Sequence, residues 1–272
     1  MKVSRPLLRW HGGKWMLAPW TIGHFPEHRT YTEVFGGGGS VLLRKPRPYS
    51  EVYNDLDGDV VNLFRVLRAP HLADSLISAI RLTPFAKEEF NGASVHTDEP
   101  VERARRLVIR SLMGFGSNAH NIAIKTGFRS NSSRSGTTPA HDWANYPDKL
   151  AAIVHRLRGV CVENRDAAEV LAQHDGPSTL HYVDPPYPHE TRADGRGDYA
   201  FETTTEGHRN LAAVLHGLLG TVILSGYPCD LYDKDLYADW HRVERVALAD
   251  GAKKRIEVLW MNRADLDGGR LL

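Results

Sequence analysis

The stretch Leu180-His181-Tyr182-Val183-Asp184-Pro185-Pro186-Tyr187 decides the fold of this chain. Its apolar half is typical of a buried strand, which must stop at the prolines because proline has no backbone N–H for a sheet ladder. The strand would deliver Asp184 to the carboxyl edge of a parallel sheet, where ligands bind in open α/β folds. A carboxylate, rigid carbonyls and an aromatic ring suit a flat polar ring that carries an exocyclic amine. Four residues alone are equally typical of a capped Pro-Pro turn, so the interpretation depends on the rest of the chain.

The composition of the 272 residues is ordinary for a globular protein, with 42% hydrophobic and 25% charged residues. This length suffices for one large domain with a second domain inserted in it. Apolar runs such as 221–224 are too short to cross a bilayer, and the first six residues form no apolar signal segment. We therefore expect a cytoplasmic protein without a membrane partner.

Residues that commonly bind metals show no pattern that predicts a metal site. The two cysteines, Cys161 and Cys229, cannot on their own form a disulfide framework or a thiolate zinc site. The 14 histidines occur without the spacing of zinc ligands. We expect no metal.

Four consecutive glycines, residues 36–39, stand between a predicted strand that ends near Phe35 and a predicted helix that begins near Ser40. A strand, a glycine turn and a helix start bring a nucleotide-like ligand against exposed backbone N–H groups. The stretch departs from the dinucleotide fingerprint, because Val41 stands where the last glycine is required, and the P-loop motif is absent. An adenosyl ligand without phosphates fits better.

Two further stretches offer groups to such a ligand. The Gly12-Gly13 turn, between Trp10 and Lys14, lets the backbone approach a ligand closely, and Lys14 can pair with a carboxylate. Asp55 stands at the tip of a second short strand, where an acid can bind both hydroxyls of a ribose.

Together these motifs carry a family resemblance. In this order, Trp10 with Gly12-Gly13-Lys14, Glu33 to Ser40, Asn54-Asp55-Leu56 and Asp184-Pro185-Pro186-Tyr187 resemble the Dam-like DNA adenine-N6 methyltransferases, which use S-adenosylmethionine. The resemblance implies an α/β fold with a Rossmann-like methyltransferase sheet, mostly parallel with a C-terminal antiparallel hairpin. It implies a catalytic domain formed by 1–67 and 150–272, and a mainly helical DNA-recognition domain inserted over 68–149.

The resemblance also implies the site residues. The catalytic residues would be Asp184, Pro185, Pro186 and Tyr187, and the cofactor would be bound by Trp10, Gly13, Lys14, Glu33, Phe35, Gly36, Gly38, Asp55, Asp166 and Asp184. Asp184 and the Pro185 carbonyl would accept hydrogen bonds from the adenine amine, so that its nitrogen lone pair can attack the methyl group. Tyr187 would stack on the base after it has left the duplex.

Charge is unevenly distributed although the net charge is only +1. Residues 103–134 contain seven bases and no acid, a local balance of +7. Arginine and lysine hold phosphates, and arginine and asparagine can contact guanine and adenine. The resemblance implies duplex DNA as the partner and a target-recognition segment between Asp55 and Asp184, where this basic segment falls, so we expect contacts from Arg110, Asn118, Lys125, Arg129 and Arg134. The alternative for the glycine- and serine-rich part of this segment is a solvated loop.

Periodicity predicts the remaining elements. Helices are expected over 58–67, 72–82, 101–113, 149–158 and 208–219, strands over 160–164 and 221–227, and a hairpin formed by 241–248 and 255–262. Asp57 and Asp59 are expected to be solvated or to cap the first of these helices, and the polar loop 189–198 to close over bound substrate.

Rival functions remain open at this point. An N4-cytosine methyltransferase shares the chemistry but more often carries Ser-Pro-Pro-Tyr. Cys229 follows a different strand from the one expected for C5-cytosine chemistry, so we interpret it as structural. A non-catalytic DNA-binding protein of the same fold would need neither the glycine loop nor the Asp184 segment, and RNA is a weaker alternative substrate. A restriction nuclease is a possible but not a required partner, and a monomer suffices to modify one strand at a time.

Overall fold

The computed structural model describes residues 2–131, 136–191, 201–248 and 254–263. Arg134, most of the polar loop 189–198 and the hairpin connection 249–253 lie outside the described residues. In chain order the helices are α1 (Ala18–Ile22), α2 (Ser40–Arg44), α3 (Gly58–Arg68), α4 (Pro70–Leu82), α5 (Lys87–Gly92), α6 (Pro100–Met113), η1 (Ser117–His120), α7 (Pro139–Ala144), α8 (Pro147–Leu157), α9 (Ala167–His174), η2 (His189–Thr191), α10 (Thr205–His216) and η3 (Leu231–Leu236). The strands are β1 (Thr30–Glu33), β2 (Ser50–Asn54), β3 (Val160–Glu163), β4 (Thr179–Val183), β5 (Thr221–Gly226), β6 (His241–Leu248) and β7 (Lys254–Met261).

Contacts divide the chain into two compact units. The helical unit comprises 1–15, 37–43 and 57–162, and the sheet unit comprises 16–36, 44–56 and 163–272. The helical unit is thus larger than the recognition domain expected over 68–149, because α3 and α8 pack against α4. The boundaries of a functional recognition domain stay a prediction.

The seven strands form one sheet in the order β3-β2-β1-β4-β5-β7-β6. Strand β1 is parallel to β2 and β4, and β4 is parallel to β5. Strand β7 is antiparallel to both β5 and β6. This order confirms the prediction of a mostly parallel Rossmann-like sheet with a C-terminal antiparallel hairpin.

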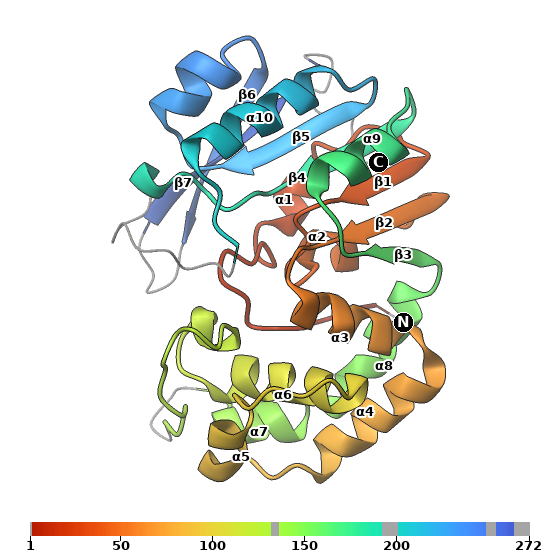
Figure 1. Cartoon of the computed structure of the whole chain (residues 1–272), viewed down its shortest axis with the longest axis vertical. Helices are drawn as coiled ribbons and strands as arrows, with labels where there is room; N and C mark the ends of the chain where they lie inside the picture. The colour runs from red at the N-terminus through yellow and green to blue at the C-terminus, as the bar shows by residue number, and fades with distance from the viewer. Residues whose placement is uncertain (1, 132–135, 192–200, 249–253, 264–272) are drawn as a thin grey trace. The chain divides into compact units, whose positions relative to one another are not determined.

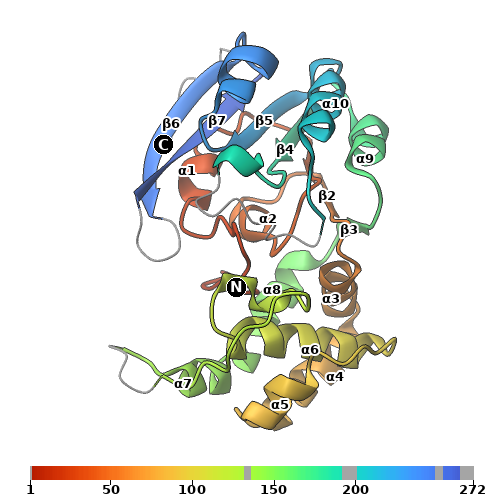
Figure 2. The same cartoon turned by 60° about the vertical axis from the view of Figure 1, so that its left-hand side comes forward.

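Side chains alternate between the two faces of the sheet, as strand geometry requires. On one face Val34, Val183 and Leu224 belong to a core that includes residues of α9 and α10. Figures 1 and 2 show these two helices on the same side of the sheet, and Figure 2 shows α1 on the other side. On that second face Phe25 lies against Tyr31 and Tyr182. The second face, which also carries Asp184 by alternation, is the face of the candidate site.

The helical unit is built on amphipathic helices whose apolar sides meet, among them α3, α4, α6 and α8. Asp57 caps α3, because its side chain accepts a hydrogen bond from the Asp59 N–H at 2.9 Å, as expected. Glu99 caps α6 in the same way, and Pro100 stands at the first helical position, where its missing N–H costs nothing.

Helix α10 departs from its predicted extent. It ends at His216 with Gly217 as its cap, so Leu219 lies outside the helix with 63% of its side chain exposed. Leu211 and Leu215 are buried, and His208 and Ala212 complete the inward side. No helix within the described ranges is both long and apolar enough to cross a membrane.

Candidate active site

Asp184 directly follows β4, and its carboxylate is held by the neighbouring strand. Ser225 Oγ, near the end of β5, donates a hydrogen bond of 2.6 Å to Asp184 Oδ1. Tyr182 Oη lies 3.2 Å from the same Ser225 Oγ. Tyr182 and Ser225 are buried, whereas Asp184 is half-buried. Burial, and then the nearby Asp184 carboxylate, raise the pKa of Tyr182 well above its ordinary value, so its hydroxyl keeps its proton.

The three residues that follow Asp184 are largely enclosed by the protein. Pro185 is buried and Pro186 half-buried. Tyr187 is only 5% exposed; its hydroxyl donates a hydrogen bond of 3.0 Å to Glu257 Oε2 on β7, and its ring meets Tyr227 edge to face. Burial raises the pKa of Tyr187 well above its ordinary value. Stacking of Tyr187 on a target base stays a prediction.

Three acids stand at the carboxyl edge of adjacent strands. Glu33 ends β1, and the register pairs it with Tyr53 on β2 and Tyr182 on β4. Asp55 and Asp184 stand two residues further along those strands, so alternation assigns all three acids to one face. Glu33 is buried and accepts a hydrogen bond of 2.6 Å from Tyr31 Oη. Phe35, the next predicted residue, is partly buried and packs against the core on the opposite face.

Asn54 joins the loops that carry these residues, a role that the sequence analysis did not assign to it. Its side-chain amide donates to the carbonyls of Val34 at 3.0 Å and Arg165 at 3.1 Å. Its side-chain oxygen accepts from the Arg165 N–H at 3.0 Å. In addition, the Gly36 N–H donates to the Asn54 carbonyl at 2.8 Å. An asparagine at the end of a predicted strand, directly before Asp55, is the signal that could have identified it.

Asp166 has a structural role that the sequence did not reveal. Its side chain accepts from the Ala168 N–H at 2.8 Å and so caps α9. The Asn164 side chain donates to the Asp55 carbonyl at 2.8 Å, which ties this segment to the end of β2. Asp166 is exposed, and its contact with an adenine ring stays a prediction.

The glycine loop is sterically fixed by aromatic rings. In the sheet unit, a Cβ at Gly36 would lie 2.2 Å from the Tyr53 ring. In the helical unit, a Cβ at Gly37 would lie 2.4 Å from Trp10 Nε1, and one at Gly38 would lie 3.2 Å from Trp10 Cβ. Gly37 also has a positive φ of 46°, a conformation that favours glycine. The loop backbone can therefore approach these rings only because side chains are absent.

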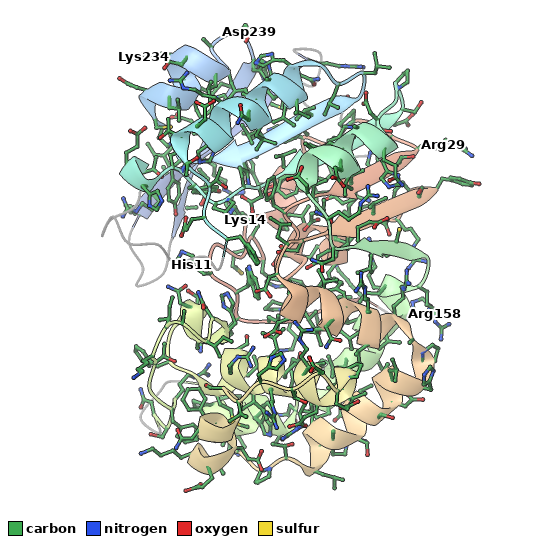
Figure 3. The ribbon with its side chains drawn as sticks, viewed as in Figure 1. His11, Lys14, Arg29, Arg158, Lys234 and Asp239 are labelled. Carbon is green, nitrogen blue, oxygen red and sulfur yellow. The ribbon has the colours of Figure 1, made fainter. Side chains whose placement is uncertain are left out.

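Within the helical unit, Trp10 stacks on His120 with ring centroids 3.8 Å apart. Burial lowers the pKa of His120 to about 4, so this ring is neutral at pH 7. The Gly13 N–H donates to the Trp10 carbonyl at 3.1 Å and closes the turn. Lys14 is buried, and its Nζ donates to the Gly12 carbonyl at 2.9 Å; Figure 3 labels its side chain together with His11. The expected cofactor contacts of Trp10, Gly13, Lys14 and Gly38 stay predictions.

The basic segment is largely neutralised within the helical unit. Arg103 and Arg110 both pair with Asp59, at 2.6 and 2.7 Å. Arg105 and Arg106 pair with Glu102, and Arg105 also pairs with Glu89 at 2.9 Å. Asp59 therefore joins α3 to α6 and is not the solvated or capping residue that the sequence suggested.

Arg110 requires a correction, because its environment does not suit a DNA contact. It is 5% exposed, and besides Asp59 it donates to the carbonyls of Ala93 at 2.8 Å and His120 at 3.1 Å. All three guanidinium nitrogens thus have partners inside the helical unit. Arg110 holds α6 in place, and we do not carry it into the DNA-binding proposal.

The other predicted DNA contacts stay predictions. Lys125 is exposed, Asn118 is half-buried in η1, and Arg129 pairs with Asp142 at 3.3 Å. Arg134 lies outside the described residues. Across the described ranges, no group of three His, Cys, Asp or Glu side chains could hold a metal ion.

Comparison with known proteins decides the family. The family model of D12 class N6 adenine-specific DNA methyltransferases matches residues 10–248. The chain belongs to this family. It is 24% identical over 233 residues to the DNA adenine methylase of Escherichia coli (strain K12), a match that covers 80% of this chain and 78% of that protein.

Two shorter matches point the same way. The DNA adenine methylase of Serratia marcescens is 32% identical over 93 residues, 34% of this chain and 33% of that protein. That of Vibrio cholerae serotype O1 is 35% identical over 68 residues, 25% of this chain and 24% of that protein. The resemblance seen in the motifs is confirmed, and adenine rather than cytosine is the base that this family methylates.

Proposed function

We propose that this D12 class enzyme transfers the methyl group of S-adenosylmethionine to N6 of an adenine that has left duplex DNA, within a short recognition sequence. The observation that carries the proposal is the position of Asp184. Asp184 has a half-buried carboxylate at the carboxyl edge of a parallel sheet. A hydrogen bond fixes one of its oxygens, and a rigid Pro-Pro turn directly follows it.

The residues of the sheet unit fit such a cofactor. Glu33, Asp55 and Asp184 place three carboxylates at adjacent strand ends, which suits a ligand that has ribose hydroxyls and positive charge on sulfur and nitrogen. Asp55 would bind the ribose hydroxyls, and Asp166 would lie near the adenine ring of the cofactor. The cofactor, when bound, supplies a methyl group activated by the sulfonium.

The N-terminal part of the helical unit offers complementary groups. Lys14 would pair with the carboxylate of the cofactor, and Trp10, Gly13 and Gly38 would contact its apolar parts. The lack of space for a Cβ at Gly37 supports this proposal, because it shows that the glycine loop lies directly against the Trp10 side chain.

Asp184 would act on the amine of the target adenine. The amine is a poor nucleophile because its lone pair is delocalised into the ring. Hydrogen bonds to Asp184 and to the Pro185 carbonyl would favour a pyramidal nitrogen and stabilise the positive charge that builds on it. Asp184 needs no strong basicity for this role. The base must first leave the helix, since N6 cannot be reached inside the stack.

DNA would be held through the helical unit. Lys125 and Arg129 are the candidates for phosphate contacts, Asn118 for a contact with a base, and Arg134 for either. A restriction nuclease as partner is not required by this chemistry, and a monomer suffices to modify one strand at a time.

Calorimetric titration with S-adenosylmethionine tests the cofactor part of the proposal. We expect binding by the unmutated protein and at least about tenfold weaker binding by Asp55→Ala, because two ribose hydroxyls would lose their acceptor. Asp74→Ala, which removes an exposed acid from α4, is the matched control. No affinity in the unmutated protein would favour the non-catalytic DNA-binding alternative.

A further inference from the structure

Ser225 is a buried hydroxyl that no motif of the sequence includes. The register pairs Tyr182 with Ile223 and Val183 with Leu224, so Ser225 lies beside Asp184 across the parallel strands β4 and β5. Ser225 is 3% exposed, and its Oγ lies 2.6 Å from Asp184 Oδ1. A contact this short with an ionised acceptor is typical of a charge-assisted hydrogen bond.

The direction of the hydrogen bonds around Ser225 follows from proton counting. A carboxylate only accepts hydrogen bonds, and serine has one hydroxyl proton, so Ser225 donates to Asp184. Tyr182 must then donate to Ser225 Oγ across 3.2 Å. The raised pKa of Tyr182 agrees, because a phenol that keeps its proton can donate. Tyr182 therefore donates a hydrogen bond to Ser225, and Ser225 donates one to Asp184.

We infer that Ser225, supported by Tyr182, is a positioning residue for methyl transfer: it fixes the orientation of the Asp184 carboxylate that accepts a hydrogen bond from the adenine amine. The inference rests on the proposed role of Asp184. One oxygen of a half-buried carboxylate has a fixed donor, so rotation of the group about its terminal bond would break a short hydrogen bond.

Ser225→Ala tests the inference because it removes the hydroxyl and adds nothing to the sheet. We expect kcat to fall about 10- to 100-fold, the cost of a misdirected catalytic group, with KM for both substrates within about threefold of the unmutated value. Ser225→Thr, which restores a hydroxyl, should recover part of that loss. Thr32→Val removes a buried hydroxyl from β1, the strand on the other side of β4, where it contacts His181, and should leave kcat within about twofold.

Two further variants separate positioning from stability. In an Asp184→Asn background, Ser225→Ala should lower residual kcat by less than it does alone, because the two residues act as one unit. If Ser225→Ala is too unstable to assay, Tyr182→Phe carries the test. It should lower kcat about 3- to 10-fold, whereas Tyr232→Phe, which removes another buried phenol hydroxyl that contacts His208, should not.

Three results would each overturn the inference about Ser225. A folded Ser225→Ala protein with kcat within about twofold of the unmutated value would overturn the inference, as would equal losses from Tyr182→Phe and Tyr232→Phe. So would a loss in Ser225→Ala that merely matches that of Thr32→Val. An unmutated protein that forms no N6-methyladenine would overturn the proposed function and this inference together.

Discussion

The side-chain amide of Asn54 donates a hydrogen bond of 3.0 Å to the carbonyl of Val34, which joins the end of β2 to the end of β1. The same side chain exchanges two hydrogen bonds with the backbone of Arg165, just after β3. One buried amide therefore holds three neighbouring loops, and these loops carry the glycine turn, Asp55 and Asp166. The edge of the sheet where we propose that the cofactor binds is therefore held together by a residue that has no cofactor contact in our proposal.

Asn54→Ala should lower the free energy of unfolding by about 2–3 kcal/mol, because it leaves buried backbone groups without partners. It should also weaken the binding of S-adenosylmethionine, since the loop ends are no longer held together. Denaturant unfolding and calorimetric titration measure the two effects. Asn62→Ala, whose half-buried side chain donates to the Pro100 carbonyl, is the control, and equal behaviour of the two variants would contradict this account.

Asp184→Ala should lower kcat by about 10³-fold or more, because the amine loses its main acceptor. Its affinity for DNA should stay within about threefold, since phosphate contacts dominate binding. Single-turnover methylation and fluorescence anisotropy measure the two quantities. Near-normal methylation by this variant would remove Asp184 from the mechanism, and parallel losses of turnover and DNA affinity would indicate a general structural defect.

The two ends of Tyr187 can be tested separately. Tyr187→Phe removes the hydrogen bond to Glu257 and should destabilise the protein by about 1 kcal/mol while the ring still stacks, so kcat should change little. Tyr187→Ala removes the ring as well and should lower kcat and the fluorescence signal of 2-aminopurine at the target position. If Tyr187→Phe loses as much activity as Tyr187→Ala, the hydroxyl rather than the ring is the important group.

Arg110 and Lys125 should behave in opposite ways. Arg110→Ala leaves Asp59 with one cationic partner fewer in a partly buried position and should lower the free energy of unfolding by about 3 kcal/mol or more.

Lys125→Ala should leave the free energy of unfolding unchanged but weaken DNA binding and reduce the slope of log K against log salt by about one. An unchanged salt slope for Lys125→Ala would exclude it as a phosphate contact.

The buried His120 predicts how stability depends on pH. Its pKa is lowered from 6.5 to about 4, so the unfolded chain binds a proton in this range that the folded protein does not. This contribution is fully present above pH 6.5 and is lost as the pH falls towards 4, by about 3 kcal/mol at most. His120→Gln should flatten the curve of unfolding free energy against pH in this window. An unchanged curve would contradict the assignment.

Local patterns were sufficient to predict the elements that depend on neighbours in sequence. The apolar run before Asp184 and the two prolines identified β4 and its end, and the glycines marked the loop after β1. The sequence marks the position of Asn54 but not its partners Val34 and Arg165, and it does not mark Ser225, because these contacts depend on which distant segments lie side by side. Arg110 was misassigned for the same reason: its partner Asp59 stands 51 residues earlier.

Transfer of a labelled methyl group from S-adenosylmethionine to unmethylated duplex DNA, followed by mass analysis of the nucleosides, tests the central claim most directly. The unmutated protein should form N6-methyladenine, and Asp184→Ala run beside it should form none that is detectable. The account would be contradicted by 4-methylcytosine as the product, by equal yields from both proteins, or by no methylated nucleoside in any duplex that is offered.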